Sequence, residues 1–251
     1  MKVANSVAFS SPQFAVLSDS QLQDLHLAAL EVLRRTGIRF HHQKALEMLR
    51  AAGAFVHDGN LVRFPASLVE EALGSAPSRI VLCDRDGEPA VWLEGTKVWF
   101  GTGSDCLNIL DPETGEHRRF TQADIVAGYR LCDALPNIHF VMSMGIPADV
   151  DTTVAYDVQM GLMLEHTTKP IVFVTDDRAS CQRAIDMAAA VAGSHEDLTE
   201  QQHILLYSEP SSPLQQSETA VDKLLLMAEH RLPIVHSPAP LMGGTGPITM
   251  A

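Results

Sequence analysis

The run Ile171–Val174 (IVFV) sets the fold class together with Ile138–Met142 (IHFVM), and a helical stretch at about residues 152–165 separates the two. Both runs have the length of a strand and are apolar on both faces. A strand that is covered on both faces has this pattern, whereas a half-exposed strand alternates apolar and polar residues. The succession of strand, helix and strand therefore predicts a parallel sheet covered by helices.

The same alternation continues to residue 236. Further strands are predicted at residues 204–207 and 234–236, and further helices at about residues 179–191 and 217–230. This gives three complete βα units and a fourth strand. An eightfold barrel needs about 250 residues by itself, yet the repeats begin only near residue 137. We therefore expect either a small open sheet or the first half of a (β/α)8 TIM-type barrel.

The first 135 residues have a more local pattern. Helical periodicity and capping signals predict helices near residues 19–36, 43–52, 65–73 and 122–134. The tight-turn sequence Asp58-Gly59-Asn60 predicts a hairpin. Four extended segments separated by turns, at residues 79–83, 90–93, 98–100 and 107–110, predict a β-meander. We thus divide the chain into an N-terminal α+β extension, residues 1–135, and a partial (β/α) barrel, residues 136–251.

The charge balance narrows the class of ligand. The chain has 18 Lys and Arg against 31 Asp and Glu, a formal net charge of −13, and no basic cluster that a nucleic acid would require. Four widely spaced cysteines indicate neither a disulfide framework nor a Cys-type zinc site, which favours a cytoplasmic location. No window approaches the ~18 apolar residues of a membrane span. We expect a small, positively charged substrate.

Parallel α/β sheets bind ligands at the carboxyl ends of their strands. The loops expected at that edge carry the acids Asp149, Asp176 and Glu209, and His236 ends the fourth strand. A packed core histidine is an equally good interpretation of His236. Three other polar residues on these loops, Asp151, Asp177 and Ser217, are interpreted as helix N-caps.

Two further motifs have a structural and a functional interpretation. Gly243–Pro247 (GGTGP) is typical of a phosphate cradle but lacks the lysine of a P-loop, so a tight turn is favoured. The loop Val98–Asp105 (VWFGTGSD) combines aromatic rings with an acid, which suits a cationic ligand, although a plain turn would also explain it. The histidines form no H-x-x-x-H pair, so a metal site could arise only through tertiary convergence and none is expected.

Several stretches together resemble the trimethylamine:corrinoid methyltransferase superfamily. In chain order they are Phe100–Asp105 (FGTGSD), Leu110–Arg119 (LDPETGEHRR), Leu135–Ser143 (LPNIHFVMS), Ser208–Leu214 (SEPSSPL) and Pro240–Thr249 (PLMGGTGPIT). The resemblance implies an (α/β)8 barrel with an N-terminal extension, roughly twice as long as this chain. It also implies transfer of a methyl group from a methylated or quaternary amine to the cobalt of a corrinoid held by a separate protein. No cofactor would be bound integrally.

The founding members of that superfamily use a pyrrolysine that would lie beyond Ala251, and relatives without it resemble betaine-type demethylases. Glycine betaine is therefore the leading substrate class. We expect Phe100 to form an aromatic wall, Asp105 and Glu209 to face the cation, and His236 to bind the substrate carboxylate. No catalytic residue is assigned.

Two alternatives remain open at this stage. The chain could be a metal-assisted barrel lyase that uses His236 with Glu209. It could also be an inactive half-barrel fragment or a binding module. A homo-oligomer is compatible with all three interpretations.

Overall fold

The structure, a computed structural model, describes residues 14–246 and residue 248, which form two compact units. The parallel-sheet unit comprises Arg79–Ser208 and Lys223–Val235. The mixed-sheet unit comprises the remaining described residues, which are 14–78, 209–222, 236–246 and 248. The division expected between residues 135 and 136 falls inside the parallel-sheet unit and stays a prediction.

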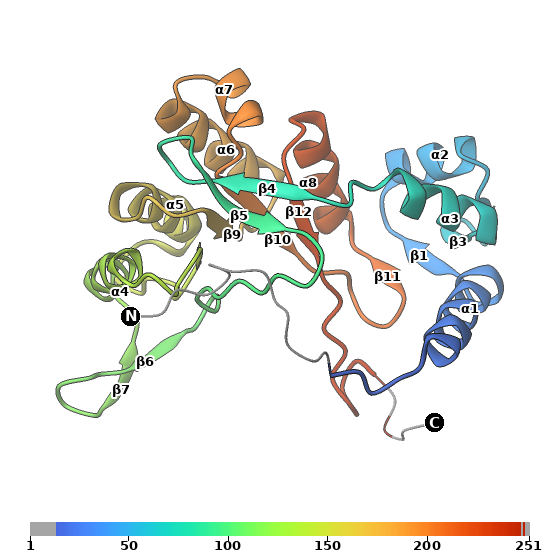
Figure 1. The fold of residues 1–251 in the computed structure, drawn as a ribbon, viewed down its shortest axis with the longest axis horizontal. Helices are drawn as coiled ribbons and strands as arrows, with labels where there is room; N and C mark the ends of the chain where they lie inside the picture. The colour runs from blue at the N-terminus through green and yellow to red at the C-terminus, as the bar shows by residue number, and fades with distance from the viewer. Residues whose placement is uncertain (1–13, 247, 249–251) are drawn as a thin grey trace. The chain divides into compact units, whose positions relative to one another are not determined.

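The parallel-sheet unit is built on four strands in the spatial order β12-β10-β9-β8 (Figure 1). Their bounds are β8 Val141–Met142, β9 Ile171–Phe173, β10 Ile204–Ser208 and β12 Ile234–His236. Helix α5 (Ala155–His166) follows β8, α6 (Arg178–Ala192) and α7 (His195–Glu200) follow β9, and α8 (Glu218–Glu229) precedes β12. The predicted alternation of strands and helices around a parallel sheet is confirmed.

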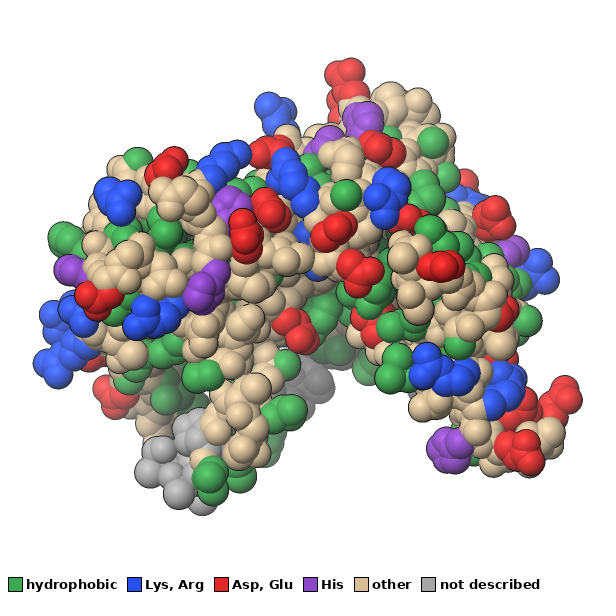
Figure 2. Space-filling view, turned by 180° about the vertical axis from the view of Figure 1, so that it is seen from behind, with side chains coloured by type: hydrophobic (Ala, Val, Ile, Leu, Met, Phe, Trp, Pro, Cys, Tyr) green, Lys and Arg blue, Asp and Glu red, His purple; other side chains and the backbone are tan. Residues whose placement is uncertain are grey.

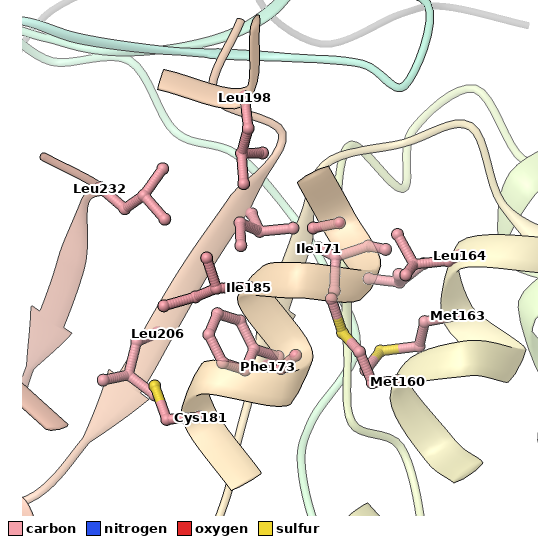
Figure 3. Packing of buried hydrophobic residues seen from close by; sticks show 14 of the residues in the cluster. Met160, Met163, Leu164, Ile171, Phe173, Cys181, Ile185, Leu198, Leu206 and Leu232 are labelled. Atoms are coloured by element: carbon pink, nitrogen blue, oxygen red, sulfur yellow. The ribbon is translucent and has the colours of Figure 1, made fainter. Parts of the chain in front are cut away.

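Both faces of this sheet are buried, as the apolar runs predicted. On one face, Phe173 and Leu206 pack against Cys181 and Ile185 of α6, while Met160 of α5 belongs to the same cluster (Figure 3). On the other face, Val172 and Leu205 pack with Leu82 and Val91. The latter two side chains come from the antiparallel pair β4 (Ile80–Cys83) and β5 (Pro89–Leu93).

The prediction of a β-meander before the parallel sheet is wrong. Strands β4 and β5 form one hairpin, and β6 (Asn108–Leu110) and β7 (His117–Arg119) form a separate one. Residues 98–100 form no strand. Instead, residues 101–106 run parallel to β8 through the bridges Gly101–Phe140 and Cys106–Gly145. Turn signals are local and say nothing about which distant segment a strand joins, so the sequence could not predict this pairing.

The segment beside β8 depends on close backbone approach. A Cβ atom at Gly101 would lie 2.2 Å from the ring of Phe140, so the tight contact requires a glycine. Helix α4 (Gln122–Ala134) follows the β6–β7 hairpin and begins with the predicted capping box, in which Thr121 and Asp124 exchange side-chain to backbone hydrogen bonds.

The mixed-sheet unit has the strand order β11-β1-β3-β2 and three helices. The elements are α1 Asp19–Arg35, β1 Ile38–Phe40, α2 Gln43–Ala51, β2 Phe55–His57, β3 Leu61–Arg63, α3 Ala66–Ser75 and β11 Gln215–Gln216. The three helices and the β2–β3 hairpin confirm the sequence predictions. The hairpin turn uses positive φ at Asp58 and Gly59, which explains the residue types there. The core of the mixed-sheet unit is formed by Leu46, Ala54 and Val62.

Within the part of the chain that the structure describes, no helix is both long enough and apolar enough to cross a bilayer.

Candidate functional site

The carboxyl ends of β8, β9 and β10 carry buried hydroxyl side chains. Ser143, Thr175 and Ser208 are 0%, 3% and 4% exposed. Leu206 pairs with Phe173, so continuing the register by two residues places Ser208 beside Thr175. Side chains two residues apart point to the same face, so these hydroxyl groups face the side that α6 and α8 cover. We call this region the carboxyl edge.

Asp105 is held at the carboxyl edge by two hydrogen bonds with Ser143. The backbone N–H of Asp105 donates to Ser143 O at 2.6 Å, and Ser143 Oγ donates to Asp105 Oδ1 at 2.9 Å. Asp105 has a φ of 54°, a left-handed conformation that Asp tolerates better than most residues. The glycine-rich loop therefore fixes a half-buried carboxylate at the end of β8.

Two tyrosines report the local electrostatic field. Burial, with smaller contributions from the negative charges of Asp105 and Asp176, raises the pKa of Tyr156 to about 12. Burial also raises the pKa of Tyr129. The Tyr129 hydroxyl donates to Met142 O at 3.4 Å and accepts from the Met144 N–H at 3.3 Å. Both phenols stay protonated at neutral pH, and the field at Tyr156 is negative.

Lys223 of α8 is the buried cation of the carboxyl edge. Its side chain is 9% exposed, and Nζ donates to Thr175 O at 2.5 Å. Burial lowers the pKa of Lys223, whereas the charges of Asp176 and Asp105 raise it. An ammonium group and two carboxylates thus act on one another at this edge.

Phe100 lies at the start of the segment that leads to Asp105. Its side chain is 56% exposed, and its N–H donates to His139 Nδ1 at 3.0 Å. The rings of Phe100 and His139 lie 6.4 Å apart, while His139 meets Trp99 edge to face at 4.9 Å. Phe100 therefore offers an exposed aromatic face on the same segment as Asp105.

Glu209 and His236 belong to the mixed-sheet unit. Glu209 directly follows β10 and is exposed. His236 ends β12, and its Nε2 lies 3.1 Å from Gln216 Oε1. Because the Gln216 oxygen only accepts, Nε2 carries the proton and the buried Nδ1 has a lone pair. Burial lowers the pKa of His236, which favours the neutral ring. The structure therefore brings Asp105, Ser143 and Lys223 to the carboxyl edge, with Glu209 and His236 in the other unit.

Several residues singled out in the sequence have structural roles. Asp151 and Asp177 are N-caps of their helices, and Ser217 Oγ accepts from the Ala220 N–H at 3.2 Å. Asp149 accepts a hydrogen bond from the first N–H of α4 at 3.0 Å. The N-cap predictions for Asp151, Asp177 and Ser217 are confirmed, whereas Asp149 had been predicted as an acid at the ligand-binding edge.

The glycine motif near the end of the chain forms a tight turn. The N–H groups of Gly244, Thr245 and Gly246 all donate to Leu241 O at 2.8 to 3.0 Å. Donors engaged in this way do not form an anion cradle, so the interpretation as a turn is confirmed for Gly243–Gly246. Pro247, the last residue of the motif, lies outside the described residues.

No cluster of three or more His, Cys, Asp and Glu side chains with metal-binding geometry occurs in residues 14–246 and 248. Cys181 is buried beside the carboxyl edge, and burial raises its pKa to about 11, so its thiol stays protonated at neutral pH. Acidic and basic side chains are interspersed on the face that Figure 2 shows.

Sequence reasoning missed Lys223, Tyr156 and Ser143 as residues of the candidate site. The signal for Lys223 was present, because Ala220, Lys223 and Met227 share one helical face and all three are buried. A lysine in the apolar stripe of a helix next to a parallel sheet therefore indicates a functional or neutralising role. Nothing in the sequence distinguishes Ser143 from an ordinary residue after a strand.

The whole chain, residues 1–251, matches the profile of a family described as "Trimethylamine methyltransferase (MTTB)". Three relatives illustrate the range of similarity. Trimethylamine methyltransferase MttB of Desulfitobacterium hafniense is 32% identical over 238 residues, which cover 94% of this chain and 48% of that protein. Glycine betaine methyltransferase of Desulfitobacterium hafniense (strain Y51) is 25% identical over 243 residues, which cover 96% of this chain and 50% of that protein. Trimethylamine methyltransferase MttB of Methanosarcina barkeri is 28% identical over 258 residues, which cover 99% of this chain and 52% of that protein. The chain spans about half the length of these curated relatives.

Proposed function

The chain belongs to the trimethylamine methyltransferase (MTTB) family, and we propose that it binds a methylated or quaternary amine at the carboxyl edge as part of a methyltransferase. The methyl acceptor is the cobalt of a corrinoid held by a separate protein. When the C–N bond breaks, its electron pair stays on nitrogen and the acceptor supplies the pair for the new bond. The observation that carries the proposal is the Asp105 carboxylate fixed by Ser143 at the end of β8.

The charges at the carboxyl edge suit a cation that has no N–H to donate. A quaternary ammonium ion is held by carboxylates and aromatic faces rather than by hydrogen bonds. Asp105 and Asp176 create a negative field at Tyr156, and Phe100 exposes a ring on the Asp105 segment. Orienting the C–N bond and excluding water would be the main contributions of the protein.

The remaining site assignments are proposals. Phe100 forms an aromatic wall, and Asp105 and Glu209 face the ammonium group. His236 binds a substrate carboxylate only when its ring is protonated, and burial works against protonation. Glycine betaine is the leading substrate, and the chemistry requires no metal on this chain.

The architecture and setting of the whole protein are also proposals. The parallel sheet, extended beside β8 by residues 101–106, forms part of a TIM-type barrel. A homo-oligomer is supported by the exposed apolar side chains Leu22, Leu25 and Val32 on α1, which are 52%, 58% and 44% exposed. A cytoplasmic location agrees with the four free cysteines.

Calorimetric titration of the chain with glycine betaine tests the proposal. Asp105→Asn removes the charge with little change of shape and is expected to weaken binding about 10-fold or more, because unit charges ~4 Å apart near a protein surface attract by up to ~4 kcal/mol. Glu209→Gln tests the second acid in the same way. Asp86→Asn is the matched control, since Asp86 is an exposed acid in the β4–β5 turn.

Circular dichroism should show unchanged folding in all three variants. Equal affinity of the wild type and Asp105→Asn would remove Asp105 from the site. Equal losses in Asp105→Asn and Asp86→Asn would show that only the general acidity of the chain attracts the ligand.

A further inference from the structure

We propose that Lys223 binds a carboxylate group of the ligand and thereby selects zwitterionic betaines over simple quaternary ammonium ions. This inference rests on the proposed function, because it concerns the same ligand at the same carboxyl edge. It assigns the selectivity of the site to one side chain of α8 (Figure 1).

The geometry of Lys223 leaves donors for a ligand. An ammonium group has three N–H donors, and within the described residues Nζ makes one hydrogen bond, to Thr175 O at 2.5 Å. The side chain is only 9% exposed, so little water is available for the other two donors. A buried cation with free donors is costly unless an anion accepts them.

Ser208 supplies a second donor at the same place. Its side chain is 4% exposed, and among the described residues its Oγ has no hydrogen-bond partner. Continuing the register two residues beyond its last pair, Leu206–Phe173, puts Ser208 beside Thr175, whose carbonyl accepts from Lys223, on the face that α8 covers. Buried hydroxyl groups are normally hydrogen-bonded, so an unpartnered one next to a lysine indicates an acceptor that is supplied by a ligand.

Opposite charges for the two ends of a zwitterion lie at neighbouring strand ends. Asp105 is anchored to Ser143 at the end of β8, and Lys223 is anchored to Thr175 at the end of β9. Neighbouring strands lie about 4.8 Å apart, so the acid and the base stand at adjacent strand ends. The pKa of Lys223 responds to Asp105 and Asp176, as well as to Asp177 and Cys181, which shows that these groups share one electrostatic environment.

The sign of the Lys223 charge decides between ligand classes. A simple quaternary ammonium ion would be attracted by Asp105 and Asp176 but repelled by a buried ammonium group nearby. A betaine turns the same charge into an attraction, because its carboxylate accepts from Nζ while its trimethylammonium group faces the acids. The site therefore discriminates by repulsion as well as by attraction.

The test compares glycine betaine with choline, which has the same trimethylammonium group but a hydroxyl in place of the carboxylate. We expect the chain to bind betaine at least ~10-fold more tightly than choline in calorimetry. Lys223→Met should weaken betaine binding about 10- to 100-fold while choline binding is unchanged or improved. Lys169→Met is the matched control, because Lys169 Nζ also donates to backbone carbonyls, those of Cys132 and Leu135, without facing the carboxyl edge.

A second measurement follows the pH dependence of ligand binding. The ratio of betaine to choline affinity of the wild-type chain should fall as the pH rises and Lys223 loses its proton. Because burial lowers the pKa of Lys223, the midpoint of this fall should lie below the usual pKa of lysine. Lys169→Met should show the same pH profile as the wild type.

The outcomes separate this inference from the proposed function. Choline binding as tight as betaine binding, or an unchanged ratio in Lys223→Met, would overturn the role of Lys223 and leave a quaternary-amine site standing. A ratio that collapses in His236→Ala but not in Lys223→Met would assign the carboxylate to His236 instead. No binding of either ligand would overturn both the inference and the proposed function.

Discussion

Strand β9 of the parallel-sheet unit buries all three of its side chains, whereas strand β2 of the mixed-sheet unit leaves Phe55 60% exposed. The first sheet is covered on both faces, by α5, α6 and α8 on one and by the β4–β5 hairpin on the other. The second sheet has a small core around Val62. The same kinds of apolar residue therefore contribute very differently to stability in the two units.

The difference also concerns where function is placed. The parallel sheet positions Asp105, Ser143 and Lys223 through strand ends that are fixed from both sides. Rigid strands hold side chains more precisely than loops do. In the mixed-sheet unit, His236 and Gln216 are joined by a hydrogen bond beside a sheet with many exposed positions. We therefore expect the geometry at the carboxyl edge to be the more sensitive to mutation of its supporting core.

The largest loss of stability is expected from a substitution in the core of the parallel sheet. Phe173 is fully buried, so Phe173→Ala should lower the free energy of unfolding by about 3–5 kcal/mol in urea denaturation. Phe55→Ala makes the same chemical change at an exposed position of β2 and should cost no more than about 0.5 kcal/mol. Similar costs in the two variants would refute the contrast between the sheets.

A smaller effect tests the segment beside β8. In Gly101→Ala the new methyl group would meet the Phe140 ring, so the variant should lose about 1–3 kcal/mol of unfolding free energy and some affinity for betaine. Gly103→Ala is the matched control two residues further, where a Cβ atom meets nothing within 4 Å. It should be neutral or stabilised by up to about 1 kcal/mol. Equal behaviour of the two variants would mean that residues 101–106 do not pack on β8 as described.

These contrasts show which features a sequence can predict. The runs that are apolar on both faces predicted the parallel sheet, because a strand that is buried on both faces has apolar residues at nearly every position. The N-cap signal at Ser18 and the capping box at Thr121 predicted two helix starts for a similarly local reason. The pairing of residues 101–106 with β8 could not be predicted, since Gly101 indicates close approach but does not name Phe140 as the neighbour.

The candidate site was predictable to a similar degree. Asp105 was predicted to face a ligand because an acid and aromatic rings share one short glycine loop. The structure places it at the end of β8, and its role stays a prediction. Lys223 comes from a helix more than a hundred residues away in the sequence and meets the site through Thr175. A single helical face shows that Lys223 is buried, but only the packing of α8 on the sheet shows what it contacts.

The smallest expected effect on stability is seen by comparing substitutions of two arginines, one in each unit. Arg118 joins β7 to Asp111 at 2.8 Å and to Asp124 of the α4 capping box at 2.6 Å. Among the residues that the structure describes, Arg34 pairs only with Glu31 on its own helix α1. The Thr114 N–H and the Arg118 guanidinium lower the pKa of Asp111 to about 2, and Arg118 is the main cause of the lowered pKa of Asp124. We expect Arg118→Ala to lower the melting temperature by a few degrees at pH 7, and Arg34→Ala to change it hardly at all.

The pH dependence of that difference identifies its origin. A carboxylate whose pKa is lower in the folded state stabilises the fold above its unfolded pKa, which is about 3.9 for Asp, and the stabilisation is lost as the pH falls toward the folded pKa. The difference in melting temperature between wild type and Arg118→Ala should therefore shrink between about pH 4 and pH 2, while Arg34→Ala should follow the wild type throughout. A difference that stays constant down to pH 2 would mean that Arg118 acts through packing of its aliphatic stem rather than through Asp111 and Asp124.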